Sequence, residues 1–454
     1  MSIFTRSVPF RANTIKALND PSLRSALRHA TETFAQKRSE AKASVPFEAW
    51  RDDASAMRSD VLSNLSGYLD LFRARAVRAG ATVHLAKDAG SAREIIVSVL
   101  KQFSAKRIVK SKSMITEEIH LNSYLHQQGF NVVETDLGEY IIQLAQESPS
   151  HIIVPAVHKT RRQVGRLFAE KLGCDYTEDP FVLTKIVRRV LRDEFVSADA
   201  GISGANFAVA DSGSIVIVTN EGNGRMVTTL PPLHIAVFSI EKIIPSLADL
   251  PKLLRTLTRS ATGQTLSSYV SVITGSRKPG ETTGATELHL VILDNGRSEI
   301  VNGEFREILK CVRCGACMNV CPVYRTVGGH AYASTYPGPM GIILTTLLER
   351  MERAHTLLDA TTLCGACAEV CPVKVPLPRL LRRLRELRVE QDFTTQMERR
   401  GMDGFALAAQ SPRIFHLGQK VARLSWPLLK KLDGNGALVR MPRPDPVTFT
   451  RRMQ

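Results

Sequence analysis

The sequence predicts an α/β domain with a largely parallel sheet, preceded by helices and followed by a small helical module that carries cysteines. Three observations predict this fold class. Apolar residues recur at helical spacing up to about residue 90, β-rich runs then alternate with helical segments, and seven of the eight cysteines lie between residues 311 and 371. We therefore expect four regions: N-terminal helices at 1–90, an α/β domain at 91–302, a cysteine module at 303–392 and a basic C-terminal region at 393–454.

The N-terminal region reads as helical because apolar positions recur three or four apart in "LRSALRHATETFAQKRSEAKA" and "MRSDVLSNLSGYLDLFRARAVRAG". The first residues, "MSIFTRSVPFRANT", contain no apolar run of signal-peptide length. No stretch approaches the ~18 apolar residues that span a bilayer. We therefore expect a cytoplasmic protein whose cysteines are thiols or metal ligands rather than disulfides.

The composition is that of a globular protein with a basic excess. Hydrophobic residues make up 44% and charged residues 23% of the chain, and the formal net charge is +16. Such a charge indicates an acidic partner, an anionic membrane surface or nucleic acid, or else basic residues spread over solvated helix faces. The chain lacks a recognisable nucleic-acid-binding fold and interleaved aromatic and basic residues, which argues against nucleic acid.

The region from 91 to 302 alternates predicted strands with predicted helices. Strands are expected in "RIVKSK", "NVVETD", "HIIVPAV", "FAVADSGSIVIVTN", "HIAVFSI", "YVSVITG" and "LHLVILDNGR", and a helix in "DPFVLTKIVRRVLRDEF". This alternation is typical of a parallel sheet covered by helices. No G-x-G-x-x-G opens a helix, so we expect no dinucleotide site.

Two polar stretches of this domain are candidate ligand sites. Lys110, Ser111, Lys112 and Ser113 lie between a predicted strand and a predicted helix, where cations and hydroxyls can hold a phosphate or carboxylate. The alternative is a capping box in which Ser113 or Thr116 is the N-cap residue.

The second stretch is the glycine-rich loop of "VTNEGNGRM". Glu221, Asn223 and Arg225 follow a predicted strand there, as in many α/β ligand sites. The alternative is an ordinary turn built from Asn and Gly.

The first cysteine motif has the spacing of a bacterial ferredoxin. Cys311, Cys314, Cys317 and Cys321 form C-x2-C-x2-C-x3-C and are followed by Pro322. In this run three thiolates reach one iron–sulfur cubane, and the fourth cysteine ligates the other cluster. A zinc site, the alternative, favours two C-x2-C pairs. The eighth cysteine, Cys174, is far away in the sequence and is expected to be an incidental thiol.

The second motif has only three cysteines. If fourth cysteines are exchanged, Cys371 completes the first cluster, and the second cluster receives Cys321, Cys364 and Cys367. In strict register its missing ligand falls at Thr361. The sequence leaves three answers open: a [3Fe–4S] cluster, an oxygen or nitrogen ligand, or a cubane with an open or partner-supplied corner. The candidates for a ligand other than cysteine are Asp359, His355 and His330.

The spacing between the motifs indicates the type of ferredoxin. The 42 residues between Cys321 and Cys364 include "MGIILTTLLERMERA", which predicts a helix and so an α-helical ferredoxin. Beyond the motifs, "LPRLLRRLRELRVEQD" predicts an amphipathic helix whose leucine face packs on the module. Its arginine face is expected to meet an acidic partner or anionic lipid, or simply water. The remaining tail is expected to be irregular or a docking segment.

Several stretches together resemble a known family. "KSKSMITEEIHLN", "GEYIIQLAQESPSHIIVPAVHK", "GSIVIVTNEGNGRM" and "LHLVILDNGR", followed by the two cysteine motifs, resemble the lactate utilization protein B family over the whole chain. The resemblance implies an LUD domain, related to the NagB/RpiA/CoA-transferase-like fold, before a ferredoxin module with two [4Fe–4S] clusters. It also implies that seven motif cysteines, with a gap at Thr361, are the family pattern.

The resemblance further implies an electron carrier in a three-protein system that oxidises L-lactate to pyruvate. We expect the partners to be a Cys-rich redox subunit and a second LUD protein, and the acceptor to be quinone-linked, at the inner face of the membrane. The chain itself is then a non-catalytic component of an L-lactate dehydrogenase complex. The alternative is that the α/β domain is itself a CoA-transferase-like catalytic or ligand-binding module, with structural or regulatory clusters.

Overall fold

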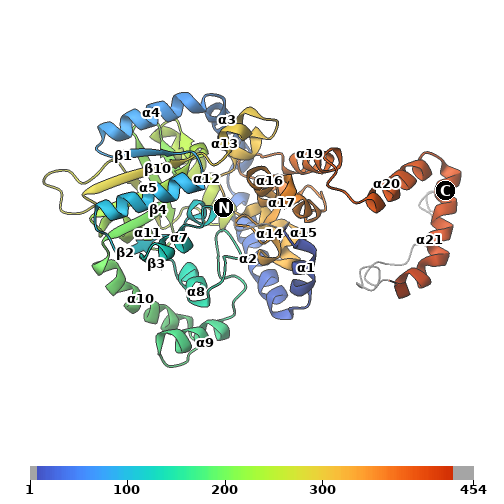
Figure 1. Ribbon diagram of the computed structural model, residues 1–454, viewed down its shortest axis with the longest axis horizontal. Coiled ribbons are helices and arrows are strands. Elements are labelled where there is room, and N and C mark those ends of the chain that lie inside the picture. Colours follow the sequence, from blue (N-terminus) through green and yellow to red (C-terminus); the bar gives the residue numbers. More distant parts are fainter. Residues whose placement is uncertain (1–7, 433–454) are drawn as a thin grey trace. The chain divides into compact units, whose positions relative to one another are not determined.

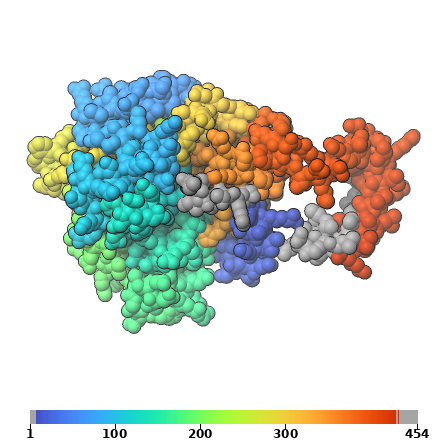
Figure 2. Space-filling view, viewed as in Figure 1, coloured from blue at the N-terminus to red at the C-terminus, as the bar shows by residue number. Residues whose placement is uncertain are grey.

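The computed structural model describes residues 8–432, which fall into two compact units with a boundary between residues 386 and 387 (Figure 1). The first unit opens with four helices: α1 (Phe10–Leu18), α2 (Pro21–Ala43), α3 (Phe47–Ser63) and α4 (Leu65–Arg78). Asp20 starts α2 by accepting a hydrogen bond from the backbone N–H of Leu23. In Figure 2 the dark-blue α1 and α2 lie beside the orange cysteine module, and α3 and α4 pack on the α/β domain.

The α/β domain is built on a six-stranded sheet in which every adjacent pair is parallel, as predicted. In spatial order its strands are β1 (Thr82–Ala86), β10 (Glu287–Leu293), β7 (Leu233–Ser239), β4 (Ala200–Gly204), β2 (Arg107–Lys110) and β3 (Asn131–Glu134). The chain runs from β2 outward to β3 and then returns through β4 toward the other edge. This reversal between β2 and β4 is the place where open α/β sheets bind ligands, outside the carboxyl ends of the strands.

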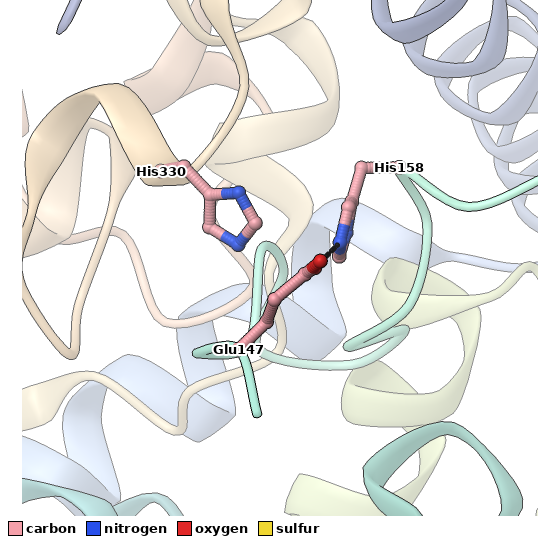
Figure 3. A group of neighbouring side chains, drawn as sticks. All are labelled: Glu147, His158 and His330. Carbon is pink, nitrogen blue, oxygen red and sulfur yellow. Dashed lines mark hydrogen bonds and ion pairs between the residues drawn. The ribbon is translucent and has the colours of Figure 1, made fainter. Parts of the chain in front are cut away.

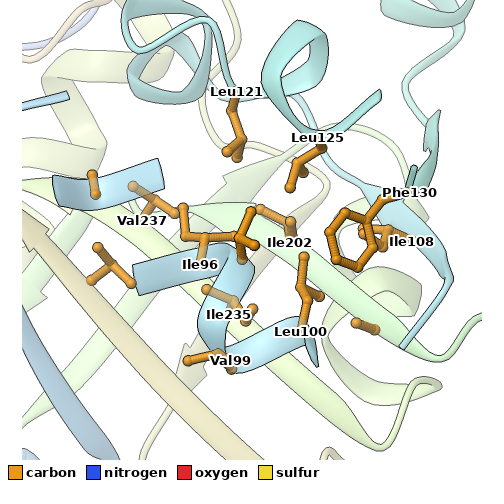
Figure 4. Close-up of a cluster of buried hydrophobic side chains, with 14 of the residues drawn as sticks. Ile96, Val99, Leu100, Ile108, Leu121, Leu125, Phe130, Ile202, Ile235 and Val237 are labelled. Atoms are coloured by element: carbon orange, nitrogen blue, oxygen red, sulfur yellow. The ribbon is translucent and has the colours of Figure 1, made fainter. Parts of the chain in front are cut away.

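Helices cover both faces of this sheet. One face carries α5 (Ala89–Gln102), α6 (Met114–Glu118) and α7 (Leu121–Gln127), and the other carries α8 (Leu137–Ala145), α9 (Arg161–Leu172), α10 (Pro180–Ser197) and α11 (Asn223–Thr229). On the first face Ile96 and Leu100 of α5 meet Ile202 and Ile235 of the strands (Figure 4). All four are fully buried, and each such side chain contributes about 1.5–3 kcal/mol.

A second sheet joins the α/β domain to the N-terminal helices. Its order is β8 (Ile243–Ile244), β5 (Phe207–Val209), β6 (Ser214–Thr219) and β9 (Tyr269–Ile273), with β5, β6 and β9 antiparallel. The β5–β6 turn needs Gly213, which has a φ of 69° and lies so close to α4 that a Cβ would be 2.2 Å from the nitrogen of Ala76. The connections contain η1 (Ile240–Lys242), η2 (Leu247–Asp249), α12 (Leu250–Ala261) and α13 (Arg297–Asn302).

The cysteine module is helical, as predicted. It contains η3 (Arg306–Lys310), α14 (Ala316–Val320), α15 (Pro322–Val327), η4 (His330–Tyr332), α16 (Gly338–Glu349), α17 (Met351–Ala354), η5 (His355–Asp359), α18 (Ala366–Glu369) and the start of α19 (Leu377–Glu390). The predicted "MGIILTTLLERMERA" helix is α16 followed by α17, and it breaks at Arg350, which has a φ of 67°.

The leucine face predicted for α19 is buried through Leu377, Leu380, Leu381 and Leu384. The arginine face has partners within the first unit. Arg379 pairs with Glu307, Arg383 with Glu304, and Arg385 donates to the backbone carbonyls of Leu358 and Thr361. Exposed pairs of this kind contribute about 0–1 kcal/mol. Whether this face meets an acidic partner, anionic lipid or only water stays a prediction.

Some of the strand predictions differ from the structure. The predicted strand "HIIVPAV" is a series of bends and turns, because His151 Nδ1 accepts the backbone N–H groups of Ile153 and Val154 and Pro155 has no N–H to donate to a ladder. The strand β1 lies inside the region 1–90, where only helices were expected. The strand β4 was not predicted at all. Its sequence, "AGISG", has low β-propensity since Gly201 must admit α11: a Cβ there would lie 1.9 Å from the carbonyl oxygen of Val227.

The second unit contains the end of α19 and two further helices, α20 (Gln396–Ala409) and α21 (Pro412–Leu432). The expectation of an irregular tail is therefore wrong for most of residues 393–432, where the Thr395–Glu398 capping box starts α20. The segment "RMPRPDPVTFTRRMQ" lies outside the described residues. Among the helices between residues 8 and 432, none is both long enough and apolar enough to cross a bilayer.

Candidate iron–sulfur centre

Four cysteines line one small cavity in the first unit: Cys311, Cys314, Cys317 and Cys371. Local conformation brings them together. Gly315, in the left-handed region with a φ of 75°, starts the helix α14 and turns Cys317 back toward Cys311 and Cys314. Cys371 follows α18. Most of the remaining wall is apolar, from Val312, Met340, Val373, Val375 and Leu377, and Arg313 adds a cation.

The other three motif cysteines, Cys321, Cys364 and Cys367, form a second group in which each thiol is close enough to interact electrostatically with another. Cys321 and Cys367 are buried and Cys364 is exposed. The seven side chains therefore lie in the two groups that an exchange of fourth cysteines requires, and their ligation of iron stays a prediction. Cys174 belongs to neither group and packs against the core beneath α8, α9 and α10.

The first group fits a four-iron cluster. Backbone N–H groups point at two of its sulfurs, from Arg313 to Cys311 Sγ at 3.4 Å and from Val375 to Cys371 Sγ at 3.3 Å. Burial, and then the neighbouring Cys311, raise the pKa of Cys371 to about 11. Four thiolates this close together, with Cys314 and Cys371 buried, need a bound cation to share the site, and iron supplies that charge.

The position of the missing eighth ligand is occupied by a satisfied threonine. Thr361 Oγ1 accepts the backbone N–H of Leu363 at 3.2 Å, and the Thr361 carbonyl accepts from Arg385 at 2.7 Å. His355 and Asp359 lie at the two ends of η5, which comes just before Thr361 in the chain. A [3Fe–4S] cluster, a ligand such as Asp359 or His355, and an open or partner-supplied corner all stay predictions for this site.

The third candidate, His330, is engaged elsewhere. Its Nε2 donates to the carbonyl of Ser148 at 2.7 Å, and its ring lies 4.5 Å from that of His158. His158 in turn bonds to Glu147 at 2.7 Å (Figure 3). These contacts connect the "HIIVPAVHK" loop to the cysteine module, and His330 takes part in that connection.

Two arginines of the N-terminal helices hold the peptide that carries Cys371. Arg51 of α3 donates to the carbonyls of Cys371 at 2.8 Å and Ala368 at 3.1 Å, and Arg38 of α2 donates to the carbonyl of Val370 at 3.0 Å. Sequence reasoning missed both. For Arg51 a signal was available. Together with Arg58 it lies on the face of α3 that carries Ala54, and this face is otherwise buried and apolar.

Replacing Arg51 with methionine is expected to destabilise the protein by about 2 kcal/mol, because the buried carbonyl of Cys371 and the partly buried carbonyl of Ala368 lose their donor. The first cluster should also be lost faster in air. Anaerobic denaturant titration and the rate of iron release measure the two effects. The matched control is Arg73→Met, which removes only an exposed contact with Asp70. Equal behaviour of the two variants would contradict a holding role for Arg51.

A buried network of charges connects the first cysteine group to the α/β domain. The carboxylate of Glu241, fully buried at the end of β7, pairs with Arg297 at 3.0 Å and with Arg313 of the cysteine loop at 3.2 Å. Arg297 also pairs with Glu118 at 2.6 Å, and Glu118 accepts from the hydroxyl of Tyr336 at 2.7 Å. Burial alone would raise the pKa of Glu241, but Arg297 and Arg313 lower it to about 2.

Two of the predicted ligand residues do not face a site. Lys110 is 1% exposed and pairs with Glu134 at 2.5 Å and Glu117 at 3.3 Å. Arg225 lies over the ring of Tyr269, with its guanidinium carbon 5.0 Å from the ring centroid. The sequence could not show this because Glu134 and Tyr269 come from strands whose pairing is set by the fold.

The other five, Ser111, Lys112, Ser113, Glu221 and Asn223, line one cavity of about 370 Å³. The capping-box alternative is wrong: Ser113 precedes α6 but its side chain makes no capping hydrogen bond, and Thr116 Oγ1 donates back to the carbonyl of Ser113. The turn alternative for Glu221 and Asn223 is also incomplete, because Asn223 begins α11 and both residues face the cavity.

Comparison with known proteins gives two matching families. The family described as LUD domain matches residues 69–293, and the family described as 4Fe-4S dicluster domain matches residues 307–375. The first match begins in α4 and includes β1, ahead of the boundary expected at residue 91.

Similar proteins have matching lengths. The "Uncharacterized electron transport protein YkgF" of Escherichia coli (strain K12) is 44% identical over 419 residues, covering 92% of this chain and 88% of that one. Two proteins described as "Lactate utilization protein B", from Shouchella clausii and Bacillus subtilis, are each 44% identical. They cover 98% and 91% of this chain, and 93% and 87% of their own lengths. A crystal structure of a DUF162 family protein from Deinococcus radiodurans aligns with a TM-score of 0.30 and 13% identity, over 51% of this chain and 98% of that one.

Proposed function

Because this chain belongs to the lactate utilization protein B family, we propose that it is the iron–sulfur electron-transfer subunit of a system that oxidises L-lactate to pyruvate. The observation that carries the proposal is the separation of the seven cysteines into two groups with different environments. The first group has no exposed cysteine, and the second includes the exposed Cys364. Two neighbouring clusters, one of them with a ligand at the surface, suit a relay that receives electrons at one site and delivers them at another.

When bound, the two clusters supply one-electron carriers. The chain's own residues fix the thiolates and their surroundings. Arg51 holds the Cys371 peptide, Arg313 places its N–H on Cys311 and its guanidinium on Glu241, and the apolar walls exclude water. Backbone N–H groups directed at cluster sulfurs favour the reduced state, because they stabilise the added negative charge.

The lactate-oxidising step belongs to a partner in this proposal. The sequence has no fingerprint for binding a dinucleotide, the cofactor that would accept a hydride. In this proposal the hydride chemistry therefore takes place on another subunit. We propose a Cys-rich redox subunit and a second LUD protein as partners, a quinone-linked acceptor, and a cytoplasmic location at the inner face of the membrane.

Anaerobic reconstitution tests the proposal. The purified protein with two clusters should remain oxidised when L-lactate is added alone, and both clusters should become reduced when L-lactate is added together with the partner subunits. EPR spectroscopy measures the reduction. Clusters that stay oxidised in the complete system, while pyruvate is formed, would show that electrons bypass this chain.

The second cluster should be the labile one, since it has three cysteines and no fourth thiolate at Thr361. In air the isolated protein is expected to show one [3Fe–4S] EPR signal per chain, because an iron without a thiolate is the easiest to lose. Anaerobic addition of iron, or binding of a partner subunit, should abolish the signal. Two air-stable [4Fe–4S] clusters in the isolated protein would instead indicate a hidden eighth ligand, and His355 and Asp359 would then be replaced first.

Restoring the missing cysteine provides the complementary test. Thr361→Cys is expected to remove the [3Fe–4S] signal in air, because a fourth thiolate retains the labile iron. Thr361→Ser is the matched control, which keeps a hydroxyl but adds no thiolate. If both variants retain the signal, residue 361 does not face the cluster.

A further inference from the structure

The cavity of about 370 Å³ lies between the α/β domain and the first cysteine group. Its floor is formed by the loops after β2, β4 and β7, at the carboxyl ends of the parallel strands where the order reverses. Its roof comes from Val312, Arg313 and Tyr336 of the cysteine module. Val312 and Arg313 also line the cavity of Cys311, Cys314, Cys317 and Cys371, so one two-residue turn separates the two cavities.

The acidic groups in this cavity are already satisfied. Asp136 accepts the backbone N–H groups of Gly138 and Glu139 at 3.0 and 3.2 Å, as the cap of α8. Glu221 accepts the N–H of Leu137, and the Lys112 ammonium donates to the carbonyl of Ile153. These groups balance one another at the side of the cavity near β2 and β3. They leave that side without a free cation for an anionic ligand.

The side near the cysteines has uncommitted donors. Arg313 is 9% exposed, and its Nη2 holds Glu241 while its Nη1 is buried without a hydrogen-bond partner in the described chain. The Lys242 ammonium has no hydrogen bond or ion pair to any of residues 8–432. Asn206 uses its Oδ1 to accept the N–H of Val218, which leaves its amide N–H₂ available. Two cations and an amide donor therefore have unused capacity around one cavity.

We propose that this cavity binds a small organic carboxylate, held by Lys242 and Arg313, directly beside the first iron–sulfur cluster. A guanidinium and an ammonium with unused donors match the oxygens of a carboxylate. A volume of about 370 Å³ is near the lower end of ligand pockets, which suits a small metabolite rather than a dinucleotide. The inference rests on the proposed function in one respect: L-lactate and pyruvate are the carboxylates to test first.

A carboxylate bound in this cavity should change the reduction potential of the first cluster. A carboxylate at Arg313 adds a negative charge one turn away from Cys311, and a reduced cluster carries one more negative charge than an oxidised one. Binding is therefore expected to lower the reduction potential of the first cluster, because like charges repel across a buried gap. The EPR spectrum of that cluster should change on binding, while that of the second cluster should not.

Titration calorimetry on the anaerobic protein with both clusters tests the binding. L-lactate, pyruvate and, as a different anion, inorganic phosphate are the probes. Lys242→Gln is expected to weaken carboxylate binding about 10-fold or more, because a hydrogen bond to a charged group is lost. Asn206→Asp should weaken it similarly while the new carboxylate still accepts from Val218. Arg225→Gln is the matched control for loss of a positive charge outside the cavity, and its affinity should equal that of the wild type.

Each outcome decides between the two proposals. Binding that Lys242→Gln and Asn206→Asp both weaken, together with a shifted EPR spectrum of the first cluster, supports the carboxylate site. Binding that only Arg225→Gln weakens, tighter binding of phosphate, or absence of carboxylate binding overturns it. If carboxylates do not bind but the clusters are still reduced in the complete system, the carboxylate site is rejected and the electron-transfer function stands. If carboxylates bind but the clusters stay oxidised in the complete system, the carboxylate site stands and the electron-transfer function is rejected.

Discussion

Replacing Cys371 with serine is expected to remove the same cluster as replacing Cys311, although 60 residues separate the two in the sequence. Both line the cavity with Cys314 and Cys317, and Cys371 interacts electrostatically with Cys311. A serine hydroxyl is a much poorer iron ligand than a thiolate at neutral pH, so each change should cost the chain about one cubane, or about four irons.

Iron content per chain and EPR spectra of the reduced protein measure the effect. Cys311→Ser and Cys371→Ser should give the same spectrum, that of the second cluster alone, and Cys364→Ser should give the spectrum of the first. Cys174→Ser is the matched control, since Cys174 packs against an apolar core and should leave both clusters intact. If Cys371→Ser and Cys364→Ser share a spectrum, the fourth cysteines are not exchanged between motifs.

The cysteine grouping could be predicted from the sequence because ligand spacing is a local property. Cys311, Cys314 and Cys317 lie within seven residues. The C-x2-C-x2-C-x3-C-P spacing predicts that the fourth thiolate ligates the other cluster. The parallel sheet was likewise predictable, since strands such as β7 and β10 contain apolar runs of four residues, IAVF and LVIL. In both cases the signal is contained in a short stretch of chain.

What the sequence could not provide depends on contacts between distant segments. Lys110 looks like a ligand cation until the fold places Glu134 beside it, and Lys242 carries no motif that marks it as a cavity residue. Arg51 and Arg58 read as ordinary surface arginines of a charged helix, and the pair between Arg51 and Glu48 supports that reading. Their other partners include backbone carbonyls more than 180 residues away, and no sequence pattern marks a backbone carbonyl as a partner.

The buried carboxylate of Glu241 is expected to be the single most important charge for the stability of the first unit. Replacing it with glutamine keeps its size but leaves Arg297 and Arg313 with less negative charge around them in a site without water. Breaking one partner of a buried ion pair typically costs about 3–5 kcal/mol. We expect Glu241→Gln to lower the free energy of unfolding by that amount at pH 7, measured by anaerobic denaturant titration.

The pH dependence of this difference gives a second, independent measurement. The pKa of Glu241 is lowered from an ordinary 4.5 to about 2, because Arg297 and Arg313 outweigh the opposing effect of burial. A lowered pKa means that the stabilisation is fully present above about pH 4.5 and is lost as the pH falls from there toward 2. A shift of this size corresponds to about 3 kcal/mol, in agreement with the cost of breaking the pair.

The stability gap between wild type and Glu241→Gln should therefore be constant from pH 7 to about pH 5 and should narrow below pH 4.5. Measuring the gap rather than each stability cancels the acid sensitivity of the clusters, because both proteins carry the same ones. Glu281→Gln is the matched control, an exposed glutamate whose replacement should change the stability by no more than about 0.5 kcal/mol. A Glu241→Gln protein as stable as this control would show that the two arginines are neutralised by other groups, with Glu118 and the Cys311 thiolate as the nearest candidates.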